Sequence, residues 1–307
     1  MDTTRLYLFG RFDVVSDSGH VRGFEARKIQ ELFSYLLLAK KRPIQRERLA
    51  DRLWPNVDTR RCKKYLRQAL WQLQKVTVRG VDASPRQQLL VVDQEWIEIN
   101  PEADLWVDVL EFERAYEYAI GAPTGELCPE LRSTVKSAVE LYRGELLEGW
   151  YHNWCLYPRD AYRSMYLALL DVLMVDAEAS GAWEAGLAYG RRALTEDRAN
   201  ERTYVRMMRL HCRAGNRTEA LRQYDVCAGA LNEELGVTPE SGTRQLYELI
   251  RDEGRVDTVC EPAPALVGAG MATGSPESLG RLRELNRSLS QLQEHVVGQI
   301  RALERGA

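Results

Sequence analysis

An amphipathic, basic helix is predicted over residues 58–76. Its apolar side chains recur at intervals of three and four residues, which places them in one stripe along a helix of 3.6 residues per turn. The stripe consists of Cys62, Leu66, Ala69, Leu70, Leu73 and Val76. Asp58 and Thr59 stand before it as candidate N-caps. The pattern therefore predicts a helix that packs one face against a core.

The other faces of this helix carry positive charge and amide groups. They hold Arg60, Arg61, Lys63, Lys64, Arg67, Gln68, Trp71, Gln72 and Lys75. Cations neutralise DNA phosphates and amides bind base edges, so the pattern suits a helix in a DNA major groove. The alternative interpretation is a solvated basic face on an ordinary core helix. The neighbouring elements have to decide between the two.

A small sheet and two helices are predicted ahead of the basic helix. Alternating apolar residues between 6 and 24, interrupted by turn residues, predict a small antiparallel sheet. Apolar residues at helical spacing predict a first core helix over 25–42 and a shorter helix over 44–55. Arg46 and Arg48 lie at the start of the shorter helix, where we expect them to contact phosphates.

A polar loop and a β-hairpin are predicted behind the basic helix. Residues 77–88 form the loop, which contributes Arg79 and Arg86 as further candidate phosphate contacts. Residues 89–100 read as two strands with a turn at 93–95. A sheet, three helices and a hairpin in this order are typical of a winged helix-turn-helix, whose third helix enters the major groove. This context favours DNA binding by the basic helix.

The balance of charge also divides the chain at about residue 100. Residues 1–100 hold 19 Lys and Arg against 12 Asp and Glu, whereas the remaining 207 residues hold 23 against 33. A basic N-terminal part followed by an acidic body fits a nucleic-acid-binding domain joined to a regulatory or protein-contacting one. We therefore predict a winged-helix DNA-binding domain at residues 1–100.

Amphipathic helices are predicted throughout residues 101–252, where the strand patterns cease. The first two span 104–120 and 130–142. An aromatic cluster follows, formed by Trp150, Tyr151, Trp154 and Tyr157. Such a cluster can stack a ligand, but packing between helices is its commoner use. From Pro158 onward the helices are expected in pairs.

An internal repeat supports a stack of helix pairs. GAWEAGLAYGRRAL at Gly181 is echoed by GNRTEALRQYDVCAGAL at Gly215, an interval of 34 residues. This is the period of tetratricopeptide repeats, whose stacked helix pairs leave a concave groove for a segment of another protein. Small residues are expected to let the paired helices approach closely. These are Ala185, Ala193, Ala220 and Ala228.

The C-terminal region divides into a linker and a helix. Residues 253–276 are rich in Pro, Gly and Ala and predict a flexible linker. Apolar residues at heptad positions predict a short coiled coil over 277–307. They are Leu282, Leu285, Leu289, Leu292, Val296 and Leu303. We expect a homodimer through residues 279–303, and the alternative is a single helix docked on its own chain.

Composition and motifs bear on location and chemistry. No apolar run approaches the roughly 20 residues of a membrane span and no signal segment opens the chain, so we expect a cytoplasmic, nucleoid-associated protein without a membrane partner. The six cysteines form no CxxC pair and the four histidines are dispersed, which predicts neither a metal site nor a disulfide framework. Nucleotide-binding and hydrolase motifs do not occur, so no enzyme activity or cofactor is predicted.

Several stretches resemble a known family, in that family's own order. LYLFGRFDVV, EARKIQELFSYLLL, RERLADRLWP and TRRCKKYLRQALWQLQ resemble the DNA-binding domain of the antibiotic regulatory protein family of bacterial activators. LYRGELLEGW and ELGVTPESGTRQLYELI resemble the bacterial transcriptional activation domain that follows it. Together these resemblances cover about residues 5–252. One departure lies at the wing tip, where Asp93 and Glu95 replace an arginine suited to the minor groove.

The resemblance implies a transcriptional activator that binds promoter repeats and contacts RNA polymerase, including its sigma factor. The expected fold is mainly α and multidomain: a winged helix-turn-helix at 1–100, a tetratricopeptide-like activation domain at 101–252 and a coiled-coil helix. Lys63, Lys64 and Arg67 are the predicted main contacts to double-stranded promoter DNA. The alternative is a tetratricopeptide-type scaffold or sensor whose winged helix contacts protein.

Overall fold

In the computed structural model, the described residues all belong to one compact unit. The structure describes residues 4–16, 19–21, 23–39, 42–77, 88–103, 105–122 and 125–253. Apart from Glu253, the predicted linker lies outside the described residues, as does the coiled-coil helix with its dimer seam. Both therefore stay predictions. We call the described residues up to 103 the head and those from 105 onward the trunk.

A four-stranded sheet begins the chain, in the order β3-β2-β1-β7. The strands are β1 (Thr4–Tyr7), β2 (Asp13–Ser16), β3 (Gly19–His20) and β7 (Leu105–Val107). β2 runs antiparallel to β1, as predicted, whereas β7 runs parallel to it. The helix expected over 104–120 is therefore wrong in its first residues. Trp106 and Val107 favour a strand by propensity, and the pairing partner of this strand lies far away in sequence.

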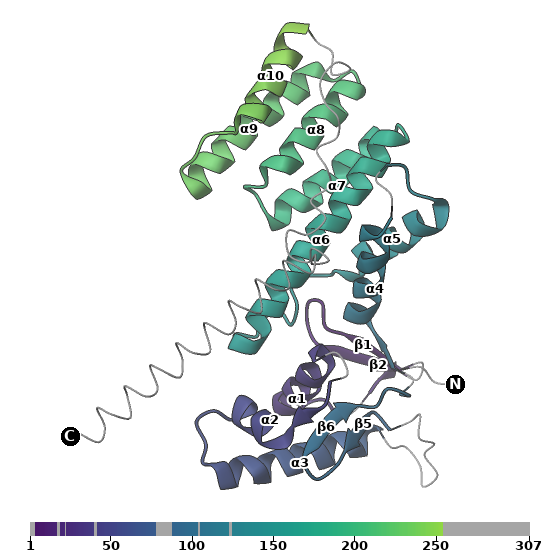
Figure 1. The fold of residues 1–307 in the computed structure, drawn as a ribbon, viewed down its shortest axis with the longest axis vertical. Coiled ribbons are helices and arrows are strands. Elements are labelled where there is room, and N and C mark those ends of the chain that lie inside the picture. The colour runs from purple at the N-terminus through teal and green to yellow at the C-terminus, as the bar shows by residue number, and fades with distance from the viewer. Residues whose placement is uncertain are drawn as a thin grey trace, which may run out of the picture. The chain divides into compact units, whose positions relative to one another are not determined.

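Three helices and a hairpin follow in the predicted order (Figure 1). The helices are α1 (Arg27–Leu38), α2 (Arg46–Leu53) and α3 (Thr59–Thr77). The hairpin pairs β5 (Leu90–Val92) with β6 (Trp96–Ile99), and β4 (Ile44–Gln45) adds a third strand beside β6. The helix expected over 44–55 thus begins two residues late, because the hairpin holds Ile44 and Gln45 in an extended conformation.

The trunk consists of helices that pack on their neighbours in sequence (Figure 1). They are α4 (Asp108–Ile120), α5 (Pro129–Leu141), α6 (Asn153–Ala179), α7 (Trp183–Glu196), α8 (Glu201–Arg213), α9 (Arg217–Leu235) and α10 (Ser241–Glu253). Pro158 lies inside α6. It is the sixth helical residue, so it removes only one backbone donor near the N-terminal end.

The internal repeat corresponds to two helix pairs, α7–α8 and α9–α10. Gly181 and Gly215 stand just before α7 and α9, with φ angles of +74° and +76°. Glycine adopts such angles without steric cost, so both pairs begin with the same turn. The repeated sequence therefore repeats in backbone geometry. Assignment of the pairs to the tetratricopeptide class stays a prediction.

Glycines, more than alanines, allow α7 to approach α8. A Cβ atom added at Gly186 would lie 2.8 Å from Leu210 Cδ1, and one at Gly190 would lie 2.7 Å from Met207 Cγ. Ala193 and Ala220 are buried as predicted, and Ala228 is half-buried. Ala185 is exposed, so its expected role at a close contact is wrong. The next residue of α7, Gly186, lies at the contact with α8 instead.

A buried carboxylate joins the head to the trunk. Asp108, the first residue of α4, is fully buried. Its two oxygens accept hydrogen bonds from the backbone N–H of Leu8 at 2.9 Å, and Oδ2 also accepts from the N–H of Phe9 at 2.9 Å. Burial raises the pKa of Asp108 to about 6, although these donors and the charge of Arg143 act in the opposite direction.

The segment before α6 closes the same junction from the other side. The N–H of Leu147 donates to Leu8 O at 2.8 Å, and the N–H of Gly10 donates to Glu145 O at 2.9 Å. The buried guanidinium of Arg159 donates to three carbonyl oxygens of this segment, at 2.9–3.0 Å. Because buried carbonyls need donors, Arg159 stabilises a turn that could not otherwise satisfy its backbone.

The apolar core runs through the junction without interruption. Phe9 packs its ring at 5.0–5.4 Å from those of Phe112, Tyr142 and Tyr162, which all belong to the trunk. One cluster of buried side chains extends from Leu6 as far as Ala193. Head and trunk are thus parts of one compact unit, and its division at residue 100 into two domains stays a prediction.

Candidate nucleic-acid interface

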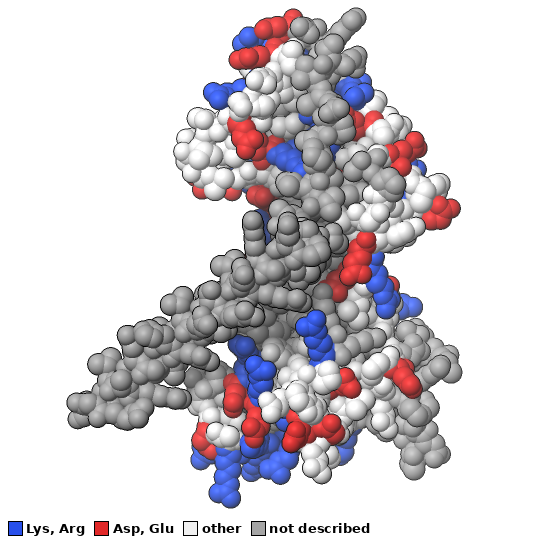
Figure 2. All heavy atoms as spheres, viewed as in Figure 1, with Lys and Arg blue, Asp and Glu red and all other residues white. Residues whose placement is uncertain are grey.

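Helix α3 separates its side chains into a buried and an exposed face, as its sequence predicts. The buried face consists of Cys62, Leu66, Ala69, Leu70 and Leu73. The exposed face carries Arg60, Arg61, Lys63, Lys64, Arg67, Gln68, Trp71 and Lys75, with Gln72 half-buried beside them. Figure 2 shows Lys and Arg side chains gathered where Figure 1 places α3. Packing therefore leaves the basic face of this helix available to a ligand.

The start of α3 is fixed by its own cap. Asp58 Oδ1 accepts a hydrogen bond from the N–H of Arg61 at 3.1 Å, which confirms Asp58 as the N-cap. Cys62 Sγ donates to the carbonyl oxygens of Trp54 and Val57, at 3.4 and 3.2 Å. Burial raises the pKa of this thiol, so it stays protonated and able to donate. The first basic turn is therefore held in place by the turn that precedes it.

Four side chains lie along the middle of the exposed face. Arg60, Lys64, Trp71 and Lys75 are separated by four, seven and four residues, which places them in one row on an α-helix. Trp71 is 55% exposed, and Lys75 Nζ lies 3.8 Å from the centre of its ring. The middle of the exposed face thus carries three cations and one aromatic ring.

Lys63 lies at the edge of this face and already has a partner. Its Nζ is 2.6 Å from Glu47 Oε1 of α2, and this contact lowers the pKa of Glu47. Both side chains are exposed, so water and salt screen the pair. The positive charge of Lys63 is nevertheless offset by a carboxylate. The contact spans 16 residues, and no helical or strand periodicity could have predicted it.

Arg46 connects the second helix to the hairpin. Its Nη1 donates to Asp93 O at 2.8 Å, and its backbone N–H donates to Glu95 O at 2.8 Å. A cleft of about 390 Å³ lies next to it, lined by Arg46, Glu47, Lys63, Leu66, Arg67 and Gln94. Arg46 thus positions the hairpin beside α3. One donor of its guanidinium is already used in the hydrogen bond to Asp93.

Asp93 shapes the tip of the hairpin. Its Oδ1 accepts hydrogen bonds from the N–H groups of Glu95 and Trp96, at 2.8 and 2.6 Å. Aspartate is common in turns for this reason, because its short side chain reaches the backbone two residues ahead. Asp93, which departs from the family pattern, therefore stabilises the turn of its own hairpin. Trp96, 44% exposed, is the first residue after this turn.

Three predicted DNA contacts remain, Arg48, Arg79 and Arg86. Arg48 is exposed but lines a different groove, together with Tyr35 and Trp154. Arg79 and Arg86 lie outside the described residues. Within the part of the chain that the structure describes, no group of three or more His, Cys, Asp or Glu is placed to hold a metal ion. None of the described helices is long and apolar enough to cross a membrane.

The predicted aromatic cluster divides into two pairs. Trp150 is buried and Trp154 half-buried, and both pack against other rings as expected. Tyr151 and Tyr157 are 83% and 84% exposed, so the expected packing between helices is wrong for them. Tyr151 precedes α6 and Tyr157 lies in its second turn, and in the described chain no neighbouring helix covers either ring.

Comparison with known proteins places the trunk in a family. Residues 107–251 match the model of the bacterial transcriptional activator domain. A solved structure titled Mycobacterium tuberculosis EmbR in complex with low affinity phosphopeptide resembles this chain with a TM-score of 0.64 at 18% sequence identity. The likeness covers 84% of this chain and 67% of the EmbR chain, and at this identity it concerns the fold. No curated protein matches the sequence. Residues 107–251 thus belong to the bacterial transcriptional activator domain family, the domain expected in this part of the chain.

Proposed function

We propose that this protein is a transcriptional regulator, acting as an activator, that binds double-stranded promoter DNA through the exposed face of α3. The observation that carries the proposal is the division of this helix. Five apolar residues fix it to the head, while a row of cations around Trp71 remains exposed. Two features that follow α3 in the sequence support the same function. They are the β5–β6 hairpin and the transcriptional activator domain.

We propose that the predicted DNA contacts differ in importance. Arg60 and Lys64 lie in the middle of the exposed face and are the proposed main cations, with Arg67 and Gln68 beside them. Lys63 contributes less, because Glu47 offsets its charge. Cations bind phosphates of any sequence, whereas Gln68 and the arginines can also bind base edges. Recognition of a defined sequence therefore depends on the N-terminal half of α3.

The trunk has the proposed task of contacting RNA polymerase, with the sigma factor as the candidate subunit. The support is the match of residues 107–251 to a transcriptional activator domain. Full-length protein, RNA polymerase holoenzyme and a promoter fragment carrying the selected site are combined in a transcription assay. More transcript in the presence of the protein supports activation. Less transcript than from polymerase alone contradicts it and indicates a repressor.

DNA binding is tested first by selecting bound fragments from a pool of random duplexes. We expect a defined repeated motif. If each head neutralises about four phosphates, the logarithm of the affinity falls with the logarithm of salt concentration at a slope of about −3.6 for one bound head and about −7 for the proposed dimer. Substitution Lys64→Ala should lower the magnitude of this slope by about one for each bound head. Lys136→Ala on the exposed side of α5 removes the same charge elsewhere and should leave affinity and slope unchanged.

Two outcomes would contradict the proposal. A folded Arg60→Ala/Lys64→Ala variant with unchanged DNA affinity would exclude the exposed face of α3 as the DNA interface. Such a result favours the alternative of a protein-binding scaffold. The second outcome is a larger loss of DNA affinity for Lys63→Ala than for Lys64→Ala. It would contradict our proposal that Lys63 contributes less to DNA binding than Lys64 because of its ion pair with Glu47. Circular dichroism of each variant separates lost binding from lost folding.

A homodimer is proposed from sequence alone, through residues 279–303. Two joined heads suit a repeated DNA site, since each head contacts one repeat. Light scattering after size-exclusion chromatography measures the mass of the full chain and of a variant that stops after residue 273. A dimer that becomes a monomer supports the proposal. Equal masses for the two proteins contradict it.

A further inference from the structure

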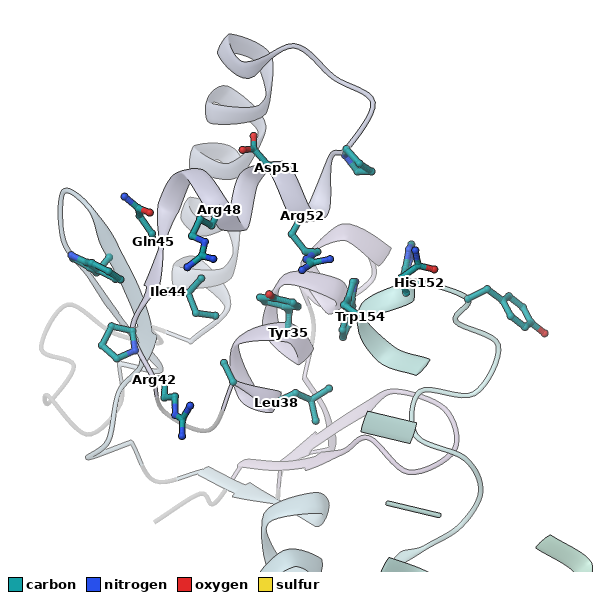
Figure 3. A pocket seen from close by; sticks show the side chains of 16 residues that line it. Tyr35, Leu38, Arg42, Ile44, Gln45, Arg48, Asp51, Arg52, His152 and Trp154 are labelled. Carbon is teal, nitrogen blue, oxygen red and sulfur yellow. The ribbon is translucent and has the colours of Figure 1, made fainter. Parts of the chain in front are cut away.

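A groove of about 1050 Å³ separates the second helix of the head from the start of α6 (Figure 3). α1, β4 and α2 form one side of it, and residues 151–154 of the trunk form the other. None of its lining residues belongs to α3, so the groove is distinct from the proposed DNA interface. Neither the domain match nor the proposed function gives this space a purpose.

The groove is rich in positive charge. Three exposed arginines line it, Arg42, Arg48 and Arg52, against the single carboxylate of Asp51. Within the described chain no salt bridge joins any of the three arginines to a carboxylate. Figure 3 shows Arg48 and Arg52 extending from α2, Arg52 toward Tyr35 of α1 and Arg48 toward Ile44 of β4. Guanidinium groups present paired donors that match phosphate and carboxylate oxygens, so the natural ligand of this surface is an anion.

Aromatic rings stand next to these arginines. Tyr35 and Trp154 meet edge to face, with ring centres 5.3 Å apart, and both are half-buried. Trp154 also stacks on His152, with ring planes 4° apart and centres separated by 6.0 Å. Tyr151 and Trp96, which are 83% and 44% exposed, also line the groove. Exposed aromatic rings in a hollow favour a planar group that can stack on them.

We propose that this groove binds a small planar aromatic anion. Its ring stacks on the aromatic side chains of the groove, and its phosphate or carboxylate group accepts hydrogen bonds from Arg48 and Arg52. Small-ligand sites span roughly 300–1,000 Å³, so the volume leaves room for a fused ring system with its charged group. The combination of features sets the class: arginines alone would accept any anion, and rings alone would accept any flat apolar molecule.

Such a ligand touches the head and the trunk at once. It contacts α2, which packs against α3, and it contacts the turn that leads into α6. Binding that stabilises this contact would change DNA affinity, and DNA would change ligand affinity by the same factor. This coupling rests on the proposed function, whereas ligand binding does not. Titrations without DNA therefore test the groove even if the protein binds no DNA.

The test uses full-length protein and the fluorescent aromatic anion 1-anilinonaphthalene-8-sulfonate as the probe. Competitors are naphthalene-2-carboxylate, an aromatic carboxylate, and adenosine monophosphate, an aromatic phosphate. 2-Naphthol supplies a ring without charge, and tricarballylate supplies charge without a ring. We expect at least one aromatic anion to displace the probe at a concentration at least tenfold below that of both controls. The stronger of the two identifies the anionic group.

Variants connect the signal to the groove. Arg48→Ala/Arg52→Ala should weaken binding of the effective competitor at least about tenfold, since charge-assisted hydrogen bonds are lost. Tyr151→Ala should weaken it severalfold. The matched control is Arg114→Ala/Arg222→Ala, which removes two exposed arginines of the trunk and should leave affinity unchanged. If the first double variant does not fold, Arg48→Lys/Arg52→Lys keeps the charges and should still lose affinity, because lysine lacks the forked donor pair.

Several results would overturn the proposal. These are no displacement by either aromatic anion, equal displacement by 2-naphthol, and an equal loss of affinity in the two double arginine variants. A twelve-base-pair DNA duplex serves as a further competitor in the same displacement experiment. If the duplex displaces the probe through Arg48 and Arg52 while neither small anion does, the groove accepts DNA phosphates and the small-ligand site is refuted.

Discussion

The buried carboxylate of Asp108 makes a quantitative prediction about stability and pH. Its pKa is about 6 in the folded protein, against 3.8 for an ordinary aspartate. Between these two values the folded state holds a proton that the unfolded state has released, so folding becomes less favourable as pH rises. A difference of about two pH units corresponds to about 3 kcal/mol in the free energy of unfolding. Above about pH 7 both states are ionised and the contribution is constant.

The substitution Asp108→Asn isolates this effect, because an amide does not titrate in this range. We expect the free energy of unfolding of the native protein, minus that of the variant, to fall by about 3 kcal/mol between pH 3.5 and pH 7. Urea denaturation followed by circular dichroism at half-unit pH intervals measures both values. Subtracting the two curves removes the contributions of all other carboxyl groups that the substitution does not disturb.

Asp176 provides a control of opposite sign. Burial alone would raise its pKa, but Arg132, which donates to its oxygens at 2.6 and 2.8 Å, and the N–H of Leu127 hold the pKa below 3.8. Its contribution to stability is present above pH 3.8 and is lost as pH falls through the folded pKa. For Asp176→Asn the same difference should therefore rise with pH. A flat or rising curve for Asp108→Asn would refute the assignment of a raised pKa to the junction.

Two further predictions concern the helix contacts and the hairpin. Gly190→Ala should destabilise the protein by about 1–3 kcal/mol, since the new methyl group meets Met207 at 2.7 Å, whereas Gly229→Ala has no atom within 4 Å and should stabilise α9 by up to about 1 kcal/mol. Thermal unfolding compares the two, and equal effects would contradict the close approach. Asp93→Ala should lower stability by about 1–2 kcal/mol through lost turn hydrogen bonds, with Glu95→Ala near neutral in the same assay.

Local patterns in the sequence were sufficient for the three helices and the hairpin of the head. The stripe of Cys62, Leu66 and Leu70 predicted which face of α3 is buried, because a helix repeats every 3.6 residues and a core accepts only its apolar side. The cap at Asp58 and the turn at 93–95 were also predicted, since both depend on contacts within a few residues. The order of these elements led to the winged-helix interpretation.

Contacts between residues far apart in sequence were not predictable in the same way. β7 pairs with β1, and Asp108 binds the backbone of Leu8 and Phe9, across about a hundred residues. A short strand and a buried aspartate look like the start of an amphipathic helix until the partner strand is known. The junction of head and trunk therefore followed only from the tertiary structure.

The sequence by itself determined the helices, their apolar faces and the basic character of α3. Only the tertiary structure decided which cations remain available, because Glu47 approaches Lys63 from another helix while Lys64 stays at the middle of the open face. It also decided that Arg48 and Arg52 line a groove together with Tyr35, and that no residue of α3 lines this groove. The physical reason is the same throughout: periodicity fixes the side of an element on which a residue lies, whereas its partner depends on how the elements pack.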